Sequence, residues 1–401
     1  MLKPDTLALT ALLALLTALG PVAVDMYLPS FPEIARVLSA PPATVQLTLS
    51  LYMVSYAVGQ VIYGPLSDRF GRIPVLRAAL LVFCAASAAC ALAPNIELLL
   101  TARAVQALGS SGAIVLARAI VRDLYSGARA GRELSLMGAI MSLAPVGAPM
   151  IGGALQSAFG WRSHFVLQIA FGLVAAFLVW RKLPETLRQR TGPLSPRAIA
   201  EGYRVILRNR AVLAYIAMLS VGFAGVFAWI SGSSFVLQDI YRLSALAFGL
   251  AFAAASGGYL AGTALATRIV TRIGIDSTIG IGAVALALGG VAAVAAVPLG
   301  GSSALPLTAA MALYAVGMGL TQPQNIAGAM MPFPERAGTA SSLVGVAQML
   351  CAALTGAIVG HLLGASAWPV AVPLALSGLA TLALWAVSRG ARAREGGYGH
   401  H

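Results

Sequence analysis

The chain has 401 residues, of which 59% are hydrophobic and only 10% are charged. Water-soluble domains carry about 25% charged residues, so this composition excludes an ordinary soluble protein and indicates a chain dissolved in a lipid bilayer. The formal net charge is +13. Its basic residues lie in short loops between apolar segments, with no basic groove or aromatic platform, so we expect no nucleic-acid partner.

Twelve apolar segments are each long enough to cross a bilayer, which takes about 20 helical residues. We therefore predict an all-α polytopic membrane protein with twelve transmembrane helices. The first segment has the look of a signal peptide, but Asp25 follows it without a clear cleavage site, and we interpret it as a membrane helix. The segments are expected near residues 6–28, 45–65, 75–93, 97–118, 133–157, 162–180, 211–233, 245–267, 277–298, 303–330, 338–363 and 367–388.

The positions of Lys and Arg orient these helices. Twelve spans put both termini on one side of the membrane, and nearly all basic residues fall in the loops of that side. The outer loops hold only Arg36, Arg162 and Arg242. Because basic residues accumulate in cytoplasmic loops, both termini are predicted to be cytoplasmic.

A long polar segment divides the chain in two. We predict an N-terminal six-helix bundle over 1–182, a cytoplasmic linker over 183–209, a C-terminal six-helix bundle over 210–390 and a cytoplasmic tail over 391–401. A weak repeat supports two pseudo-symmetric halves, since DRFGR at 68–72 and TRIGI at 271–275 follow the second and eighth spans. Such paired halves are typical of transporters, with the substrate site near the bilayer midplane. His400 and His401 could be the stub of a purification tag and are given no function.

The stretch GPLSDRFGR at 64–72 is the most specific motif in the chain. Its glycines permit close packing and a tight turn, and its arginines can reach carboxylates at the inner helix ends, with Asp123 as the expected partner of Arg72. The stretch resembles the signature between helices two and three of the major facilitator superfamily. That resemblance implies a conformational latch favouring the outward-open state, whereas the simpler alternative is a positively charged turn. The candidate latch residues are Gly64, Asp68, Arg69, Gly71, Arg72 and Asp123.

Two further stretches are similar to motifs of the same superfamily. LTARAVQALGSSGAI at 100–114 resembles the helix-four motif, with Arg103, Gln106 and Gly109 in the expected places. LAPVGAPMIGGAL at 143–155 resembles the helix-five motif of drug-exporting antiporters, although Ala148 replaces the usual glycine. Its candidate residues are Pro149, Gly152 and Gly153, and ordinary packing of small residues is the alternative interpretation.

Finer similarities point to one group within the superfamily. DMYLPSFP at 25–32, VQLTLS at 45–50, ARAIVRD at 117–123, GWRSHF at 160–165 and LPETL at 183–187 together resemble the Bcr/CflA drug-resistance group. The resemblance implies a monomeric exporter in the bacterial inner membrane that exchanges drug-like amphipathic molecules, such as bicyclomycin, chloramphenicol or florfenicol, for protons. It implies no cofactor, since the proton gradient drives export.

Asp25 and Arg103 interrupt otherwise apolar segments at similar expected depths in the outer part of the membrane. Asp25 shares a helical face with Thr10, Thr17 and Pro21, which indicates a stripe facing the protein interior or a wet cavity. Charges inside a bilayer are costly, and mutual pairing would reduce that cost. Our hypothesis is that Asp25 carries the coupling proton and that Arg103 modulates it. The alternative is a static ion pair, or two charges satisfied separately by backbone and water.

Other residues in the spans are weaker candidates for a substrate pocket, because ordinary helix packing explains each of them as well. They are Tyr27, Gln46, Gln106, Met141, Trp229, Phe235, Tyr314 and Gln322.

Drug export has three alternatives. The nearest alternative is an importer of a sugar or organic acid with the same fold, and a remote one is a membrane-embedded receptor or enzyme. No nucleophile–base set is visible, and Cys84, Cys90 and Cys351 lack metal-ligand spacing, so we expect neither an enzyme nor a metal site. ATP-driven export is disfavoured because the chain lacks a phosphate-binding loop.

Overall fold

The computed structural model describes residues 6–125, 127–187, 203–333, 337–364 and 366–395. Side chains of Leu7, of most residues between 127 and 142, and of residues 337–338 are likewise left undescribed. The described chain is helical, without strands. Its helices are α1 (Leu7–Asp25), η1 (Leu28–Ser30), α2 (Phe31–Val37), α3 (Pro42–Phe70), α4 (Arg72–Ala91), α5 (Ile96–Leu124), α6 (Gly127–Phe159), α7 (Arg162–Lys182), α9 (Arg210–Phe235), η2 (Val236–Ile240), α10 (Ala245–Leu299), α11 (Leu305–Met330), α12 (Ala337–Leu362) and α13 (Trp368–Glu395).

The predicted all-α membrane fold is confirmed. Ten helical segments of the described chain are long and apolar enough to cross a membrane. One of them, α10, has 55 residues and breaks at Gly274, where φ is 78°, so it supplies both the eighth and ninth predicted spans. Helix α6 covers the fifth predicted span. The expected twelve spans are therefore all accounted for.

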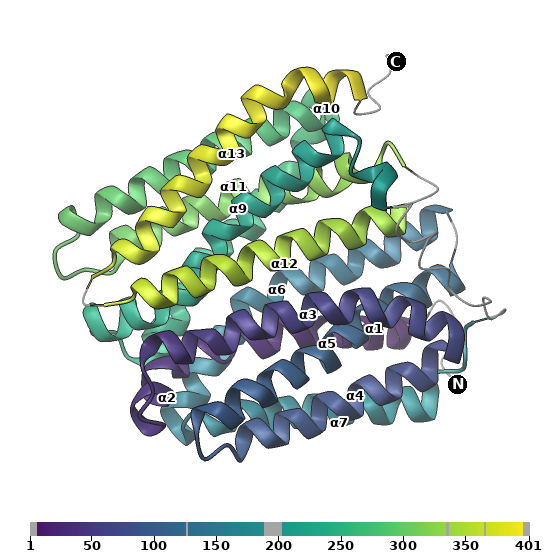
Figure 1. Ribbon diagram of the computed structural model, residues 1–401, viewed down its shortest axis with the longest axis horizontal. Coiled ribbons are helices and arrows are strands. Elements are labelled where there is room, and N and C mark those ends of the chain that lie inside the picture. Colours follow the sequence, from purple (N-terminus) through teal and green to yellow (C-terminus); the bar gives the residue numbers. More distant parts are fainter. Residues whose placement is uncertain (1–5, 126, 188–202, 334–336, 365, 396–401) are drawn as a thin grey trace. The chain divides into compact units, whose positions relative to one another are not determined.

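Contacts divide the chain into two compact units, Met1–Leu194 with Ala245–Gly249 and Ser195–Ser244 with Leu250–His401. In the first unit, α5 packs against α3 and α4, while α7 lies beside α4 (Figure 1). In the second unit, α9 packs against α11, α12 and α13. Of the predicted 183–209 linker, residues 188–202 lie outside the described chain and 203–206 are helical.

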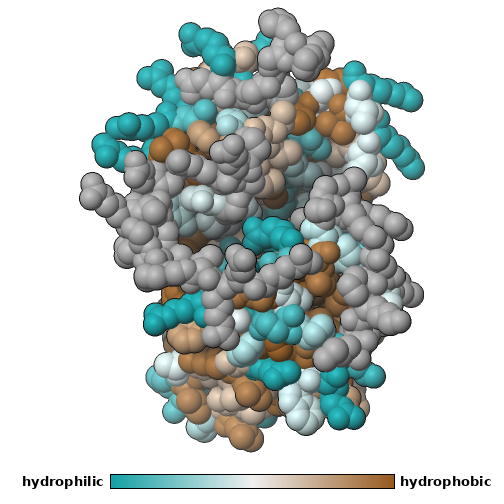
Figure 2. All heavy atoms as spheres, turned by 90° about the vertical axis from the view of Figure 1, so that its right-hand side faces the viewer, coloured by the Kyte–Doolittle hydropathy of each residue, from teal (hydrophilic) through white to brown (hydrophobic). Residues whose placement is uncertain are grey.

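The outer surfaces of the helices are apolar, as expected of a protein that faces lipid. Leu81, Phe177 and Trp180 are among many large hydrophobic side chains that remain exposed. Figure 2 presents the face at the right-hand side of Figure 1, on which hydrophilic side chains lie among hydrophobic ones. Helices satisfy their own backbone hydrogen bonds, so a helical bundle with exposed apolar side chains of this kind can face lipid.

An ion pair at the start of the ninth span holds the last helix of the second unit. Arg392 in α13 is only 1% exposed, and its Nε donates to Asp276 Oδ1 at 2.7 Å. Trp385 Nε1 also donates to the Asp276 carbonyl at 3.0 Å. Helix α13 therefore continues past residue 390, where the tail was expected to begin, and ends at Glu395. Gly274 and Gly71 both adopt positive φ, which adds a conformational match to the weak sequence repeat.

Glycine brings α4 and α5 into backbone contact. A β-carbon at Gly109 in α5 would lie 2.5 Å from the Phe83 backbone nitrogen and 2.8 Å from the Ala79 carbonyl oxygen in α4. Real β-carbons do not approach backbone atoms so closely, so the two helices can pack this tightly only with glycine at 109.

We expect Gly109→Ala to lower the free energy of unfolding by about 1–3 kcal/mol, the usual effect of overpacking a close contact. Unfolding by SDS in mixed micelles would measure it. Gly257→Ala is the matched control, because a β-carbon there meets nothing within 4 Å. Alanine is the better helix former by roughly 1 kcal/mol, so the control should be neutral or stabilising. Equal stability of the two variants would contradict the packing argument.

Candidate functional site

Asp25 is the last residue of α1 and is buried, with 5% of its surface exposed. Pro21 lies one turn earlier inside the same helix. Within the described residues, the Asp25 carboxylate makes no hydrogen bond and no ion pair. An ionisable group buried at membrane depth is costly and marks functional sites in membrane proteins.

Arg103 in α5 lies in a cage formed with Tyr27 and Tyr52. Its side chain is 0% exposed, and the guanidinium carbon is 4.6 Å from the Tyr27 ring centroid and 4.4 Å from that of Tyr52. A cation between two aromatic faces is stabilised by both, by about 2 kcal/mol each when water is excluded. This cage, formed by Arg103, Tyr27 and Tyr52, keeps a charge buried without an acidic partner.

The tyrosine hydroxyls of the cage have fixed donor roles. The Thr48 hydroxyl donates to the Val45 carbonyl at 2.6 Å, so Tyr27 must donate to Thr48 across their 3.3 Å contact. Ser110 likewise donates to the Ala107 carbonyl, which leaves Tyr52 as the donor in the 2.6 Å contact with Ser110. Each hydroxyl has only one hydrogen to donate, so these roles are fixed. The hydrogen bonds to Thr48 and Ser110 therefore help to hold the Tyr27 and Tyr52 rings in place.

A chain of hydrogen bonds extends from the cage across the first unit. Arg103 Nη1 donates to Gln106 Oε1 at 2.6 Å. Gln106 Nε2 in turn donates to Ser87 Oγ and to Gln168 Oε1, both at 2.7 Å. We call these four residues the polar network. It joins α5 to α4 and α7, and it leaves two donors of Arg103, Nε and Nη2, without a described partner.

The predicted pairing of Asp25 with Arg103 is not found among the described residues. Arg103 Nη1 instead donates to the Ala23 carbonyl at 3.1 Å, two residues before Asp25 on α1. Arg103 on α5 therefore reaches the end of α1, as expected for two residues at similar positions along neighbouring helices. Aromatic faces and a backbone carbonyl take the place of the carboxylate at Arg103, whereas Asp25 has no described partner. Neither a static ion pair nor separate satisfaction of both charges is therefore seen among the described residues.

The helix-five motif lies against the end of α1. A β-carbon at Gly152 would come within 2.2 Å of the Met26 carbonyl oxygen, directly after Asp25. Gly152 thus lets α6 approach the segment that carries Asp25. Pro149 and Gly153 lie in the same helix, one turn or less away.

The latch motif forms a compact ionic cluster at the α3–α4 connection. Arg72 Nε donates to Asp123 Oδ2 at 2.9 Å, the partner that the sequence suggested. Arg72 Nη1 donates to Asp68 Oδ1 at 2.5 Å and to Ser67 Oγ at 2.6 Å. The turn itself requires Gly71, whose φ is 102°.

Two residues of the latch motif do not join the cluster among the described residues. Arg69 makes no ion pair with a described residue, and its guanidinium carbon lies 5.2 Å from the centre of the Phe70 ring. Gly64 is within α3 rather than at the turn, and a β-carbon there would meet nothing within 4 Å among the described atoms.

Most of the predicted pocket residues are packed inside one unit or the other. Gln46 is buried and hydrogen-bonds Ser50 on the same helix. Tyr314 is buried and donates to the Gly222 carbonyl at 2.9 Å, so it serves packing between α11 and α9. Trp229 is buried beside Phe252, and Phe235 is also buried. Gln322 is half-buried in α11, and the Met141 side chain lies outside the described residues.

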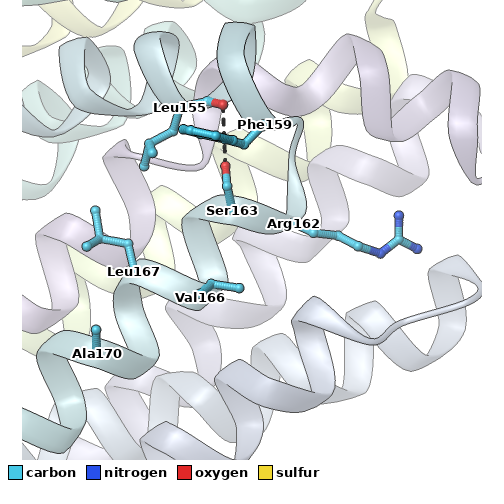
Figure 3. A pocket seen from close by; sticks show the side chains of 7 residues that line it. All are labelled: Leu155, Phe159, Arg162, Ser163, Val166, Leu167 and Ala170. Carbon is cyan, nitrogen blue, oxygen red and sulfur yellow. Dashed lines mark hydrogen bonds between the residues drawn. The ribbon is translucent and has the colours of Figure 1, made fainter.

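An open groove on the first unit contains none of these candidates. It lies between the end of α6 and the start of α7, where the Ser163 hydroxyl contacts the Leu155 carbonyl (Figure 3). Phe159 and Val166 are exposed there. Its lining is mostly apolar and consists of Leu155, Phe159, Arg162, Ser163, Val166, Leu167 and Ala170.

A second buried cluster explains two stretches that had no assigned role. Ser30, from DMYLPSFP, hydrogen-bonds His164, from GWRSHF, and also Gln156 in α6. Gln156 Nε2 donates to Glu33 in α2. His164 is fully buried, and this cluster joins η1 and α2 to α6 and α7.

Sequence reasoning missed Tyr52 and Gln168. Thr48, Tyr52 and Tyr56 recur every four residues, so a polar stripe on α3 was the available signal for Tyr52. Gln168 stands alone in an apolar helix, and only its distance to Gln106 reveals its role.

Comparisons with known proteins agree with this architecture. The family model described as Major Facilitator Superfamily matches residues 13–356. The chain is 35% identical over 361 residues to an uncharacterized MFS-type transporter, YdgK, of Bacillus subtilis, covering 89% of each chain. It is 31% identical to a bicyclomycin resistance protein homolog of Haemophilus influenzae, covering 87% of this chain and 88% of the relative. It is also 31% identical to a chloramphenicol resistance protein of Pseudomonas aeruginosa, covering 99% and 94%.

The fold is shared with solved transporters. A crystal structure of a D-xylose-proton symporter superimposes with a TM-score of 0.74 over 94% of this chain and 96% of the symporter, at 16% identity. At that identity the likeness concerns the fold alone. The family model covers most of the chain, and the named relatives match nearly its whole length. The chain therefore belongs to the major facilitator superfamily, within its Bcr/CflA drug-resistance group.

Proposed function

We propose that this transporter exports drug-like amphipathic molecules, of the bicyclomycin, chloramphenicol or florfenicol type, across the bacterial inner membrane in exchange for protons. The relatives' names support drugs as the substrate class. The observation that supports proton coupling is the buried Asp25 carboxylate, which makes no hydrogen bond or ion pair with a described residue. Arg103 contacts the same helix at Ala23, two residues earlier. A carboxylate held in this way can take up a proton on one side of the membrane and release it on the other.

Arg103 supports the proposal through its position. Its Nη1 holds the end of α1 at Ala23, and its Nε and Nη2 keep unused donor capacity. A rearrangement of the end of α1 could bring the Asp25 carboxylate to these donors, and protonation of Asp25 would favour separation. The proton would thereby bias the conformation of the end of α1, which also contacts Gly152 of the helix-five motif.

Everted membrane vesicles test the proposal directly. The cytoplasmic face of the transporter is then outside, so an acidic interior should drive each exported drug into the vesicle. We expect accumulation of one or more of bicyclomycin, chloramphenicol and florfenicol, and its loss when a protonophore removes the gradient. Vesicles without the chain provide the control.

Proton movement is measured in the same vesicles with a pH-sensitive dye. Addition of drug should release interior protons if the exchange is coupled. Drug accumulation that is the same with and without a proton gradient would contradict proton coupling. Absence of any drug accumulation, together with proton-linked movement of a sugar or organic acid toward the cytoplasmic face, would support the importer instead.

A further inference from the structure

The LPETL segment at 183–187, which follows α7, contacts the latch. The Glu185 carboxylate accepts backbone hydrogen bonds from Arg72 at 3.0 Å and from Ile73 at 3.2 Å, the first two residues of α4. It also accepts from the backbone nitrogens of Thr186 and Leu187, each at 3.0 Å. The first amides of a helix lack intrahelical partners and form its positive end, so a carboxylate stabilises them well.

Gly71 makes room for this contact. A β-carbon at Gly71 would lie 2.6 Å from Glu185 Oε2. The positive φ favours glycine at this position, and the missing side chain also leaves room for the Glu185 carboxylate, which comes from the segment after α7. The motif that defines the latch is thus shaped to receive Glu185.

Thr186 contacts Asp123, the carboxylate that pairs with Arg72 in the latch. Its hydroxyl donates to Asp123 Oδ2 at 3.0 Å, the same oxygen that accepts from Arg72 Nε at 2.9 Å. Thr186 is buried, whereas Glu185 is exposed. A second donor on one carboxylate oxygen restrains the carboxylate, so Thr186 fixes the orientation in which Asp123 meets Arg72.

We propose that Glu185 and Thr186 are positioning residues of the latch, so that the LPETL segment after α7 is a third component beside the α3–α4 turn and α5. Glu185 holds the first turn of α4, which carries Arg72, and Thr186 orients Asp123. This inference rests on the proposed function, because the latch acts on the conformational exchange that export requires. Neither residue lies near Asp25 in the chain or in the polar network, so they influence the rate of exchange rather than drug binding.

Matched substitutions at Thr186 give the sharpest test. Thr186→Val keeps the shape and removes the hydroxyl, while Thr186→Ser keeps the hydroxyl. In everted vesicles we expect Thr186→Val to lower the maximal export rate about tenfold, as loss of a hydrogen bond to a charged group implies. Drug affinity should stay unchanged. Thr186→Ser should remain within about twofold of the wild type.

A double-mutant cycle separates positioning from a merely structural role. If Thr186 acts through Asp123, Thr186→Val should have no further effect on rate in an Asp123→Asn background. The proposal would be overturned if the losses of export rate in the two single variants were additive. It would also be overturned if Thr186→Val and Thr186→Ser lost rate equally, or if drug affinity changed in place of rate. Glu97→Gln, an exposed acidic change at the start of α5, is the control for nonspecific charge effects.

Amide hydrogen exchange tests the Glu185 contact without any drug. Glutamine has one acceptor oxygen where glutamate has two, so Glu185→Gln should speed exchange of the Arg72 and Ile73 amides, and Glu185→Asp should do so less. Unchanged amide hydrogen exchange at Arg72 and Ile73 would overturn the role proposed for Glu185. If the wild type exports no drug, the proposed function fails, but the exchange measurement still decides whether Glu185 holds the start of α4. If Glu185→Gln does not fold, the Thr186 pair decides the role of the segment.

Discussion

Asp25→Asn is expected to uncouple drug movement from the proton gradient. Asparagine keeps the size of the side chain but cannot bind or release a proton. Wild-type exchange should accelerate as the side opposite the cytoplasm becomes more acidic, because protons enter there as drug leaves. A coupling free energy of about 1–3 kcal/mol corresponds to a 5–150-fold dependence on the bound proton, and this dependence should vanish in the variant.

Everted vesicles at several interior pH values measure the effect, with drug accumulation and dye-reported proton release recorded together. Asp25→Glu keeps a titratable carboxylate and should retain a gradient-dependent rate. Glu97→Gln should behave as the wild type because Glu97 is exposed at the start of α5. Undiminished, pH-dependent exchange by Asp25→Asn would rule out Asp25 as the proton carrier.

Arg103→Lys is expected to damage both stability and export, although it preserves the charge. A lysine ammonium cannot bond the Ala23 carbonyl and Gln106 while also lying flat between the Tyr27 and Tyr52 rings. Loss of a buried hydrogen bond to a charged group costs about 1.5–3 kcal/mol. We expect the free energy of unfolding to fall by about that amount, and export to fall at least about tenfold, since 1.4 kcal/mol is a factor of ten.

Unfolding in mixed micelles and export in everted vesicles would check the two effects separately. Arg162→Lys is the matched control. Arg162 also lies over an aromatic ring, 4.2 Å from the centre of Trp161, but its side chain is exposed. Exposed cation–π contacts contribute little, so the control should lose less than about 1 kcal/mol. Wild-type stability and export in Arg103→Lys would show that the cage needs only a positive charge.

The sequence predicted the arrangement of helices better than the contacts of side chains. Twelve spans follow from apolar length, because a helix needs a fixed number of residues to cross lipid. The Arg72–Asp123 contact was also predictable, since the motif places both residues at neighbouring helix ends. Gly152 could be recognised by its motif, but its partner, the Met26 carbonyl, is a backbone atom that no residue pattern encodes.

The relation of Asp25 to Arg103 shows that the sequence predicts the position of a residue along a helix but not the contacts of its side chain. Depth along a helix follows from 1.5 Å per residue, and both residues are indeed near the end of α1. The direction of a long arginine side chain depends instead on what lies around it, here two rings and a carbonyl. Arg69 is a similar case, since among the described residues its guanidinium lies over the adjacent Phe70 ring and not beside a carboxylate.

The polar network of Ser87, Arg103, Gln106 and Gln168 has a consequence for how a drug range can evolve. Each of these buried groups satisfies another, so a single change leaves a partner with an unmet hydrogen bond, at a cost of about 1–3 kcal/mol. Under the proposed function, single substitutions that extend the range of exported drugs are therefore disfavoured at these positions and expected first at residues outside the network.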